Sequence, residues 1–562
     1  MRSARPTFKF SWRPGRGRRG SKVSSQLSLG LTAADWVVCF GVLVGSILLG
    51  LYLAVRSPQR ETSDEFFLAG RKLLWPVVGA SLYATNIGAE HLVGLSGDAY
   101  RYGLKAGTVE LTTAICLGFA CAVLFPYYIR TKVFTIPEFL ELRYNAAARL
   151  FFSGLMLVIC IMTKMAFTLF AGALVLHSLM GWPIMDVVWV LAILSAVVTI
   201  IGGFAAVAYT DTIQAAIIIA GATVMTLVGL REVGGWSELV ARAQGAMHIA
   251  GPADDPNYPF WGIIAGAVYG GIFYWGIDQV NVQRALGARD LDQARWGAMF
   301  AVLLKLTPVF IFALPGVIAL TLYPGLAGEE TKQTFVLLLN KLCPAGVRGL
   351  VLAALLAAMI SSLLAMLNSI ATMSVRDFLL RIRPDTSERL QVLLGRMSIV
   401  AATVLGVAAA YLVYKTEEGL YKYLQTISIY LVMPITPAIV FGIMSRRVNM
   451  AGAAASVLVG VGISAVYVAD QLMGPETGGR WFPFLHHTLT LNYTYRGLWG
   501  TLIVTAVLFG ASWLTPPPGA EKVEHTTLRA ADLVEPFRGP ADWRLQLAAL
   551  GAITVLAYWW LW

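Results

Sequence analysis

The sequence predicts an all-α integral membrane protein with about fourteen transmembrane helices. Of its 562 residues, 57% are hydrophobic and only 13% are charged, a composition that excludes an ordinary soluble protein. Apolar stretches of about 20 residues, the length that crosses a bilayer, recur along the chain from residue 34 onward. We interpret these stretches as helices, because a helix satisfies its backbone polar groups within its own segment.

The candidate spans follow one another along the whole chain. Most of them have no amphipathic stripe, as expected for helices that are buried on all sides. Residues 34–562 are interpreted as a single transmembrane domain, and the basic residues 1–33 as a disordered N-terminal arm. The spans cover approximately residues 34–55, 74–97, 107–129, 150–180, 186–208, 211–231, 259–279, 296–323, 347–375, 393–414, 419–444, 449–469, 495–514 and 543–562.

Arginine and lysine gather in the loops after the first, third, seventh, ninth and eleventh spans. These loops all lie on one side of the membrane if the spans are counted correctly, so that side is predicted to be cytoplasmic. With an even number of spans, both termini then face outward from a plasma or inner membrane. The formal net charge of +11 is explained by basic residues in cytoplasmic loops and near the anionic headgroups of the lipid bilayer. No nucleic-acid partner is expected.

The sequence shows none of the catalytic motifs for which it was searched. It contains no HExxH motif and no nucleophile elbow. The five cysteines have neither the spacing of a zinc site nor that of a disulfide framework. The sequence therefore predicts that the protein is not an enzyme.

Two of the spans are interrupted by polar residues and glycines. The run from Asn86 to His91 breaks the apolar pattern of span 74–97. In span 259–279, the pair Gly270-Gly271 is followed by several polar and aromatic side chains. Such residues at membrane depth mark broken helices that line a cavity. The two spans lie about five segments apart, and paired interrupted spans in corresponding repeats indicate the central site of a transporter. The side chains after the glycines are Tyr274, Trp275, Asp278 and Gln279.

Other spans contribute further polar groups at membrane depth, namely Glu110, Asp211, Lys305 and Gln425. A carboxylate, an ammonium group and amides from different spans can converge on one hydroxyl-rich ligand, while Tyr274 or Trp275 covers an apolar sugar face. Simpler interpretations stay open for each residue. Glu110 can face water near the interface, and Lys305 can snorkel or pair with a carboxylate. Asp278 can cap a helix, and His91 is as readily a satisfied core residue as a ligand.

Span 347–375 contains the stretch from Ala358 to Ser362, which ends in two adjacent serines. A backbone carbonyl and two serine oxygens suit a small hard cation such as Na⁺. Taken alone, the pair is a weak indication, because serines in buried helices usually bond back to carbonyls of their own helix or pack against a neighbour.

Taken together, these motifs resemble the sodium/solute symporter family, and specifically its sodium/glucose cotransporter branch. The resemblance runs from about residue 35 to about residue 515, and the combination is far more specific than any single motif. The motifs that carry it are Ala84–Leu95, Tyr274–Val280 with Gln283-Arg284, Ala358–Ser362 continuing through Leu367-Asn368-Ser369, and Tyr423-Leu424-Gln425.

The resemblance implies a fold and a set of site residues. The implied fold has two inverted five-helix repeats of the LeuT type, at roughly 74–231 and 259–444, with broken first and sixth core helices. Peripheral helices would lie at 34–55, 449–469, 495–514 and 543–562. The implied Na⁺ ligands are the carbonyls of Ala84, Ile87 and Ala358 and the hydroxyls of Ser361 and Ser362. The implied sugar site consists of Asn86, His91, Glu110, Lys305 and Gln425, with Tyr274 as the inner gate and Trp275 beside it.

The sequence departs from the family pattern at a few positions. Gly271 stands where relatives have a small hydrogen-bonding side chain. Leu364 and Ala365 stand where members with a second sodium site have hydroxyls, so Asp211 lacks those partners. We therefore expect one Na⁺ per solute.

The expected function is Na⁺-coupled uptake of a glucose- or galactose-like hexose by alternating access, with the monomer as the functional unit. The alternatives are the same fold moving myo-inositol, sialic acid or an amino acid, and a solute sensor that does not transport. Lys305 is the cation available to an anionic solute, and Glu110 argues against such a solute.

Overall fold

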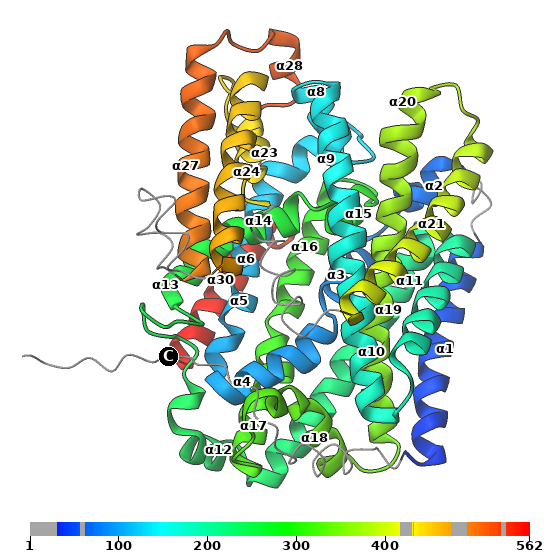
Figure 1. Cartoon of the computed structure of the whole chain (residues 1–562), viewed down its shortest axis with the longest axis vertical. Helices are drawn as coiled ribbons and strands as arrows, with labels where there is room; N and C mark the ends of the chain where they lie inside the picture. The colour runs from blue at the N-terminus through cyan, green and yellow to red at the C-terminus, as the bar shows by residue number, and fades with distance from the viewer. Residues whose placement is uncertain are drawn as a thin grey trace, which may run out of the picture.

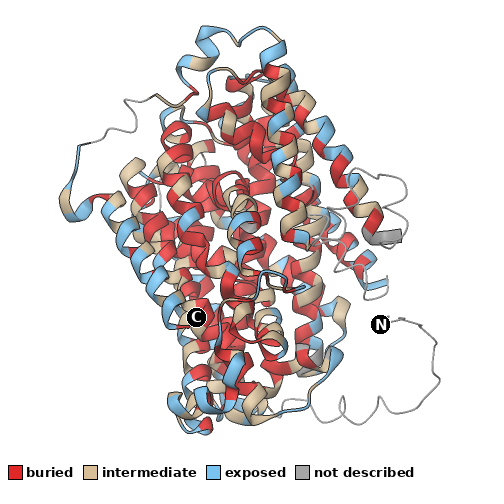
Figure 2. Ribbon diagram, turned by 90° about the vertical axis from the view of Figure 1, so that its left-hand side faces the viewer, coloured by how far each residue is buried: buried red, intermediate tan, exposed pale blue. Residues whose placement is uncertain are grey.

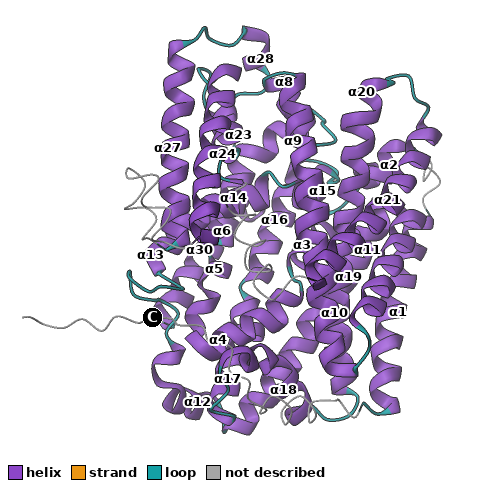
Figure 3. Ribbon diagram, viewed as in Figure 1, coloured by secondary structure: helices purple, strands orange, loops and turns teal. Residues whose placement is uncertain are grey.

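The computed structural model describes residues 31–56, 62–415, 430, 432–473, 492–529 and 536–561. Within these residues the fold is built of helices and contains no strand beyond an isolated bridge between Leu73 and Ala288 (Figure 3). The long helices run side by side along the long axis of the molecule (Figure 1). This arrangement agrees with the all-α class predicted from the sequence.

The first half of the described chain contains the first broken helix and the longest helix, Ile184–Val233. Its elements are α1 (Ala33–Val55), α2 (Ser63–Leu68), η2 (Ala69–Arg71), α3 (Trp75–Asn86), η3 (Glu90–Leu95), α4 (Ser96–Tyr102), η4 (Leu104–Gly107), α5 (Thr108–Leu111), α6 (Thr113–Phe119), η5 (Ala120–Leu124), α7 (Phe125–Arg130), α8 (Ile136–Arg143), α9 (Ala146–Val158), η6 (Ile159–Met165), α10 (Ala166–Met180), α11 (Ile184–Val233), α12 (Trp236–Ala243) and η7 (Gln244–Met247).

The second half contains the second broken helix and the most deeply buried helix of the fold. Its elements are α13 (Phe260–Gly262), η8 (Ile263–Ala267), α14 (Val268–Gly276), α15 (Gln279–Leu286), α16 (Leu291–Lys305), η9 (Val309–Ala313), α17 (Leu314–Leu322), η10 (Gly328–Gln333), α18 (Thr334–Leu342), α19 (Val347–Met373), η11 (Ser374–Leu379), α20 (Leu380–Ile382), α21 (Glu388–Lys415), α23 (Thr436–Met444), α24 (Met450–Met473), α27 (Tyr493–Leu514), α28 (Ala520–Glu524), η12 (Gly539–Ala541) and α30 (Trp543–Trp560).

Nine continuous helices in the described part of the chain are long and apolar enough to cross a membrane. The two broken helices and α30 are not among these nine. The nine candidates are Ala33–Val55, Leu104–Arg130, Ala146–His177, Ile184–Val233, Leu291–Leu322, Val347–Ile382, Glu388–Lys415, Met450–Asp470 and Tyr493–Leu514.

The first predicted interruption lies where the sequence places it. Helix α3 ends at Asn86, and Ile87 has extended backbone angles (φ −83°, ψ 118°). The chain becomes helical again in η3, a π-helix, and continues into α4. A Cβ at Gly88 would lie only 2.4 Å from a carboxylate oxygen of Glu90, so a larger residue there would require the Glu90 side chain to move.

The second interruption lies beyond the glycines that suggested it. Gly270 and Gly271 are inside α14, and the break falls at Ile277 and Asp278, before α15 begins. The Asp278 side chain caps α15 by accepting a hydrogen bond from the Val280 N–H at 3.2 Å. Gly271 instead allows close packing, because a Cβ there would lie 2.5 Å from the Cys116 sulfur.

The predicted boundary between spans 186–208 and 211–231 is wrong. Residues 184–233 form α11, which is kinked at Gly203 (φ 56°, ψ −155°). Fifty helical residues would extend about 75 Å, far more than the about 30 Å of a bilayer core, so the kink divides two crossings. Only glycine adopts this backbone conformation readily. Asp211 therefore lies about two turns beyond the kink in α11, and not at the start of a separate span as the sequence predicted.

Helix α19 forms the centre of the fold. It is buried along nearly its whole length and packs against α1, α3, α11 and α21. Figure 2 shows buried residues through the interior, with exposed residues along the outermost helices. Many exposed residues on outer helices such as α1, α11 and α27 are large and apolar, as expected for surfaces that face lipid.

Candidate cation and solute sites

The two serines of α19 point to different partners. The Ser362 hydroxyl lies 3.1 Å from the carbonyl oxygen of Thr85 in α3 and 3.1 Å from that of Ala358 in its own helix. The Ser361 hydroxyl donates to Asp211 Oδ1 in α11 at 2.6 Å. Back-bonding within α19 is therefore present, but both serines also connect α19 to a neighbouring helix. Ser362 thus connects α19 to the end of α3, where the first broken helix is interrupted, and Ser361 connects α19 to α11.

The oxygens around this junction fit a small hard cation. The end of α3 leaves its last carbonyls without intrahelical donors. The Gly88 N–H, which would bond the Ala84 carbonyl in a continuous helix, is directed at His91 Nδ1 at 3.4 Å. A serine hydroxyl that donates its proton keeps lone pairs for a second partner. Carbonyl and hydroxyl oxygens of this kind are the ligands that such cations prefer.

Asp211 and Arg284 form a completely buried ion pair beside these serines. Arg284 Nη2 lies 3.2 Å from Asp211 Oδ2, and both side chains have 0% exposure. The same carboxylate accepts hydrogen bonds from Ser81 at 2.6 Å and from Thr85 at 3.2 Å. Asp211 lacks hydroxyl partners at Leu364 and Ala365, but the structure gives it other partners. Because buried charges are tolerated only when paired and hydrogen-bonded, this network explains how Asp211 is accommodated.

Four of the predicted solute-site residues converge at the first break. Lys305 from α16 forms an ion pair with Glu110 and also hydrogen-bonds Asn86 Oδ1. His91 Nε2 lies 3.3 Å from Glu110 Oε1. The Lys305 side chain is 3% exposed and pairs with a carboxylate, so it does not snorkel to the membrane surface. The sequence alone could not decide between these two interpretations of Lys305.

Tyr274 lies beside the same group, because its side chain interacts with that of Asn86. Trp275 is buried and packs against Tyr274 edge to face, with ring centres 5.1 Å apart. Asp278 caps α15, as one interpretation of the sequence allowed. Gln425 lies outside the described residues.

Sequence reasoning missed Lys164, which forms an ion pair with Asp278 at the second break. Lys164 is the only Lys, Arg, Asp or Glu in the predicted span 150–180, which could have drawn attention to it. The prediction that Lys305 is the cation available to an anionic solute therefore omitted Lys164. Both lysines are paired with carboxylates, so neither charge is free for a carboxylate on the solute.

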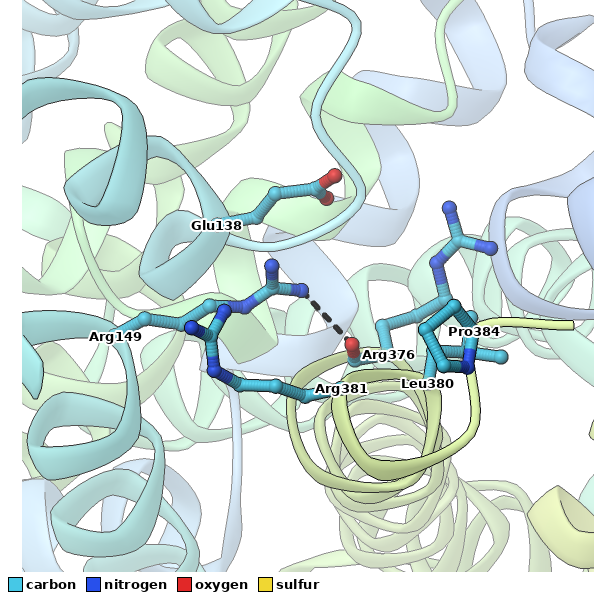
Figure 4. Close-up of a pocket in the computed structure, with 6 residues that line it drawn as sticks. All are labelled: Glu138, Arg149, Arg376, Leu380, Arg381 and Pro384. Carbon is cyan, nitrogen blue, oxygen red and sulfur yellow. Dashed lines mark hydrogen bonds between the residues drawn. The ribbon is translucent and has the colours of Figure 1, made fainter. Parts of the chain in front are cut away.

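A cavity of about 410 Å³ lies elsewhere, among arginines near the ends of α9 and α20 (Figure 4). Its arginines are held by neighbouring groups. Arg149 bonds Glu141, Asp377 and the carbonyl of Arg376, and Arg381 pairs with Glu141. These contacts tie α8 and α9 to the end of the long helical run that begins with α19. We interpret the cavity as part of this structural network and not as a solute site.

The chain is similar in sequence to known proteins. A family model described as the Sodium:solute symporter family matches residues 66–460. The sodium/myo-inositol cotransporter of Homo sapiens is 30% identical over 528 residues, which cover 85% of this chain and 73% of that protein. Sodium/glucose cotransporter 1 of Ovis aries is 31% identical over 529 residues, covering 86% and 79%.

A solved structure also resembles this fold. It is the substrate-bound outward-open state of a Na⁺-coupled sialic acid symporter, with a TM-score of 0.74 at 22% identity, covering 86% of this chain and 99% of that one. At this identity the likeness shows the fold alone. It confirms the fold class predicted from the sequence.

Proposed function

The chain belongs to the sodium:solute symporter family, and from this premise we propose that the solute it moves is a glucose- or galactose-like hexose. The family makes it a multi-pass membrane transporter with Na⁺ as the coupling ion, and not an enzyme. The observation that carries the proposal is the convergence of Asn86, His91, Glu110 and Lys305 from separate elements.

The charge of this cluster favours a neutral solute. Lys305 and Glu110 neutralise one another, while their remaining donor and acceptor capacity can reach a ligand. Sugar hydroxyls both donate and accept hydrogen bonds, so they match a site that offers a carboxylate, an ammonium group, an amide and an imidazole. Tyr274, beside Asn86, is suited to cover the apolar face of the sugar ring. An anionic solute would compete with Glu110 for Lys305.

Myo-inositol is the second candidate solute. It is favoured by the likeness to a sodium/myo-inositol cotransporter at 30% identity. It is also a neutral ring of hydroxyl groups, so the same donors and acceptors would suit it. Competition between unlabelled myo-inositol and labelled glucose during uptake distinguishes the two solutes.

In the proposed cycle, Na⁺ binds the carbonyls of Ala84, Ile87 and Ala358 and the hydroxyls of Ser361 and Ser362. These ligands would hold α3 against α19 and organise the solute site at the end of α3. Na⁺ must favour the state that binds the solute, and the solute must favour Na⁺ binding to the same extent. Entry of one Na⁺ at 100 mV contributes about 2.3 kcal/mol before the concentration gradient is added.

Four further features belong to the proposal. One Na⁺ accompanies each solute, because Leu364 and Ala365 offer no hydroxyls for a second site. Release toward the cytoplasm passes Tyr274. The monomer is the functional unit, and both termini face outward.

Uptake of radiolabelled glucose into proteoliposomes tests the proposal. An inward Na⁺ gradient should drive accumulation above the equilibrium level, and an equal K⁺ gradient should not. Binding of glucose without accumulation would indicate a sensor. Uptake of another solute that glucose does not inhibit would overturn the assignment of a hexose.

A further inference from the structure

Lys164 lies opposite the break in the second broken helix. It belongs to η6, a π-helix inside the run from α9 to α10, and it forms an ion pair with Asp278. Its ammonium nitrogen also lies over the ring of Tyr274, 5.8 Å from the ring centre, within the range of a cation–π contact. One side chain therefore contacts both the break and the aromatic residue next to it. π-Helices are frequently found at functional sites.

The residues around Lys164 connect Tyr274 to α15. Asp278 caps α15 with one carboxylate oxygen and pairs with Lys164 through the other. Asn281, also in α15, donates from Nδ2 to the backbone carbonyl of Tyr274 at 2.9 Å. The end of α14, the start of α15 and η6 are thus joined by Tyr274, Asp278, Asn281 and Lys164. Movement of α14 and α15 away from η6 must separate the ion pair.

Separating the Lys164–Asp278 ion pair leaves two charges that need new partners or water. The Asp278 side chain is 3% exposed and that of Lys164 is 26% exposed. An unpaired charge at such depth is costly until water or another partner replaces the lost contact. The pair therefore resists opening at the break until water reaches it.

We propose that Lys164 is a positioning residue for the inner gate: its pairing with Asp278 holds Tyr274 in place while Na⁺ is bound, and the pair separates when the solute leaves. The inference rests on the proposed role of Tyr274 as that gate. It adds a residue of η6 to the gate, which otherwise consists of residues of the second broken helix.

Hydrogen exchange of residues 268–286 in the purified full-length chain, measured with and without Na⁺, tests the inference. In the unsubstituted protein, Na⁺ should slow exchange in this segment several-fold. Lys164→Met should abolish that Na⁺-dependent protection, and Lys164→Arg should restore it. Lys105→Met, which removes another lysine–aspartate pair, with Asp255, should leave the protection unchanged.

A purely structural role predicts a different result. Exchange would then rise equally with and without Na⁺, together with a lower unfolding temperature, and this outcome would overturn the inference. Asp278→Asn provides a second variant, because asparagine caps helices about as well as aspartate but removes the charge. If Na⁺-dependent protection persists in Asp278→Asn, the inference is also overturned.

This measurement requires no solute. Loss of Na⁺-dependent protection in Lys164→Met would support the inference even if the unsubstituted protein failed to accumulate a hexose. Hexose uptake together with unchanged protection in both variants would support the proposed function and contradict the role of Lys164.

Discussion

Ser361 donates its hydroxyl proton to Asp211 Oδ1 over 2.6 Å, between the most buried helix of the fold and the kinked helix beside it. This bond directs the proton of Ser361 toward Asp211 and leaves lone pairs of the serine oxygen for another partner. Ser362, one residue further along α19, faces the broken helix α3 instead. The two hydroxyls thus connect a buried ion pair on one side with the break on the other.

Ser362→Ala should weaken Na⁺ dependence without preventing folding. The substitution removes one proposed ligand and the bond to Thr85, while alanine is well tolerated inside a helix. We expect the Na⁺ concentration for half-maximal uptake to rise about tenfold, equivalent to about 1.4 kcal/mol. Uptake measured over a range of Na⁺ concentrations checks this, with the amount of purified protein as control. An unchanged Na⁺ dependence would exclude Ser362 as a ligand.

Asp211→Asn should destabilise the protein, because it leaves the Arg284 charge buried without its partner. Breaking a buried pair typically costs about 3–5 kcal/mol. The unfolding temperature of the purified protein should fall clearly. The double variant Asp211→Asn with Arg284→Met should recover much of the loss, since both charges are then absent. If the double variant is less stable than Asp211→Asn, the ion pair is not the source of the effect.

Glu110→Gln should weaken solute binding more than Na⁺ binding. A hydrogen bond to a charged group contributes about 1.5–3 kcal/mol, so a rise of about tenfold or more in the solute Kd is expected. The substitution also leaves Lys305 without its carboxylate, which adds to the effect. Glucose binding by the purified protein at saturating Na⁺ measures the change. A solute Kd equal to that of the unsubstituted protein would place the solute elsewhere.

One Na⁺ should enter with each solute. The positions that would supply a second set of hydroxyls are Leu364 and Ala365, and Asp211 is already engaged by Arg284. The Na⁺ gradient that balances a fixed solute gradient at a known membrane potential gives the ratio directly. A ratio of two would require a second site in spite of these apolar residues.

Much of this architecture could be predicted from the sequence, because polar residues at membrane depth are rare. The interruption at Asn86 and the group containing Glu110 and Lys305 stand out from an apolar background for that reason. Their order along the chain made the family recognisable.

Other features depend on tertiary contacts that the sequence pattern does not contain. The kink of α11 lies at Gly203, where the backbone packs against Phe66, although the apolar pattern suggested a boundary several residues later. Likewise, the partner of Asp211 is Arg284, on a helix with little hydrophobic character of its own, and only the folded chain brings the two together.

The reciprocal effect of Na⁺ on solute affinity tests the central claim most directly. Glucose binding to the purified full-length protein would be measured with Na⁺ and with K⁺, in the unsubstituted protein and in Ser362→Ala. Na⁺ should strengthen glucose binding about tenfold or more in the unsubstituted protein, and by much less in Ser362→Ala. Equal glucose affinity in Na⁺ and K⁺ for the unsubstituted protein would contradict coupling between the serine junction and the Glu110–Lys305 cluster.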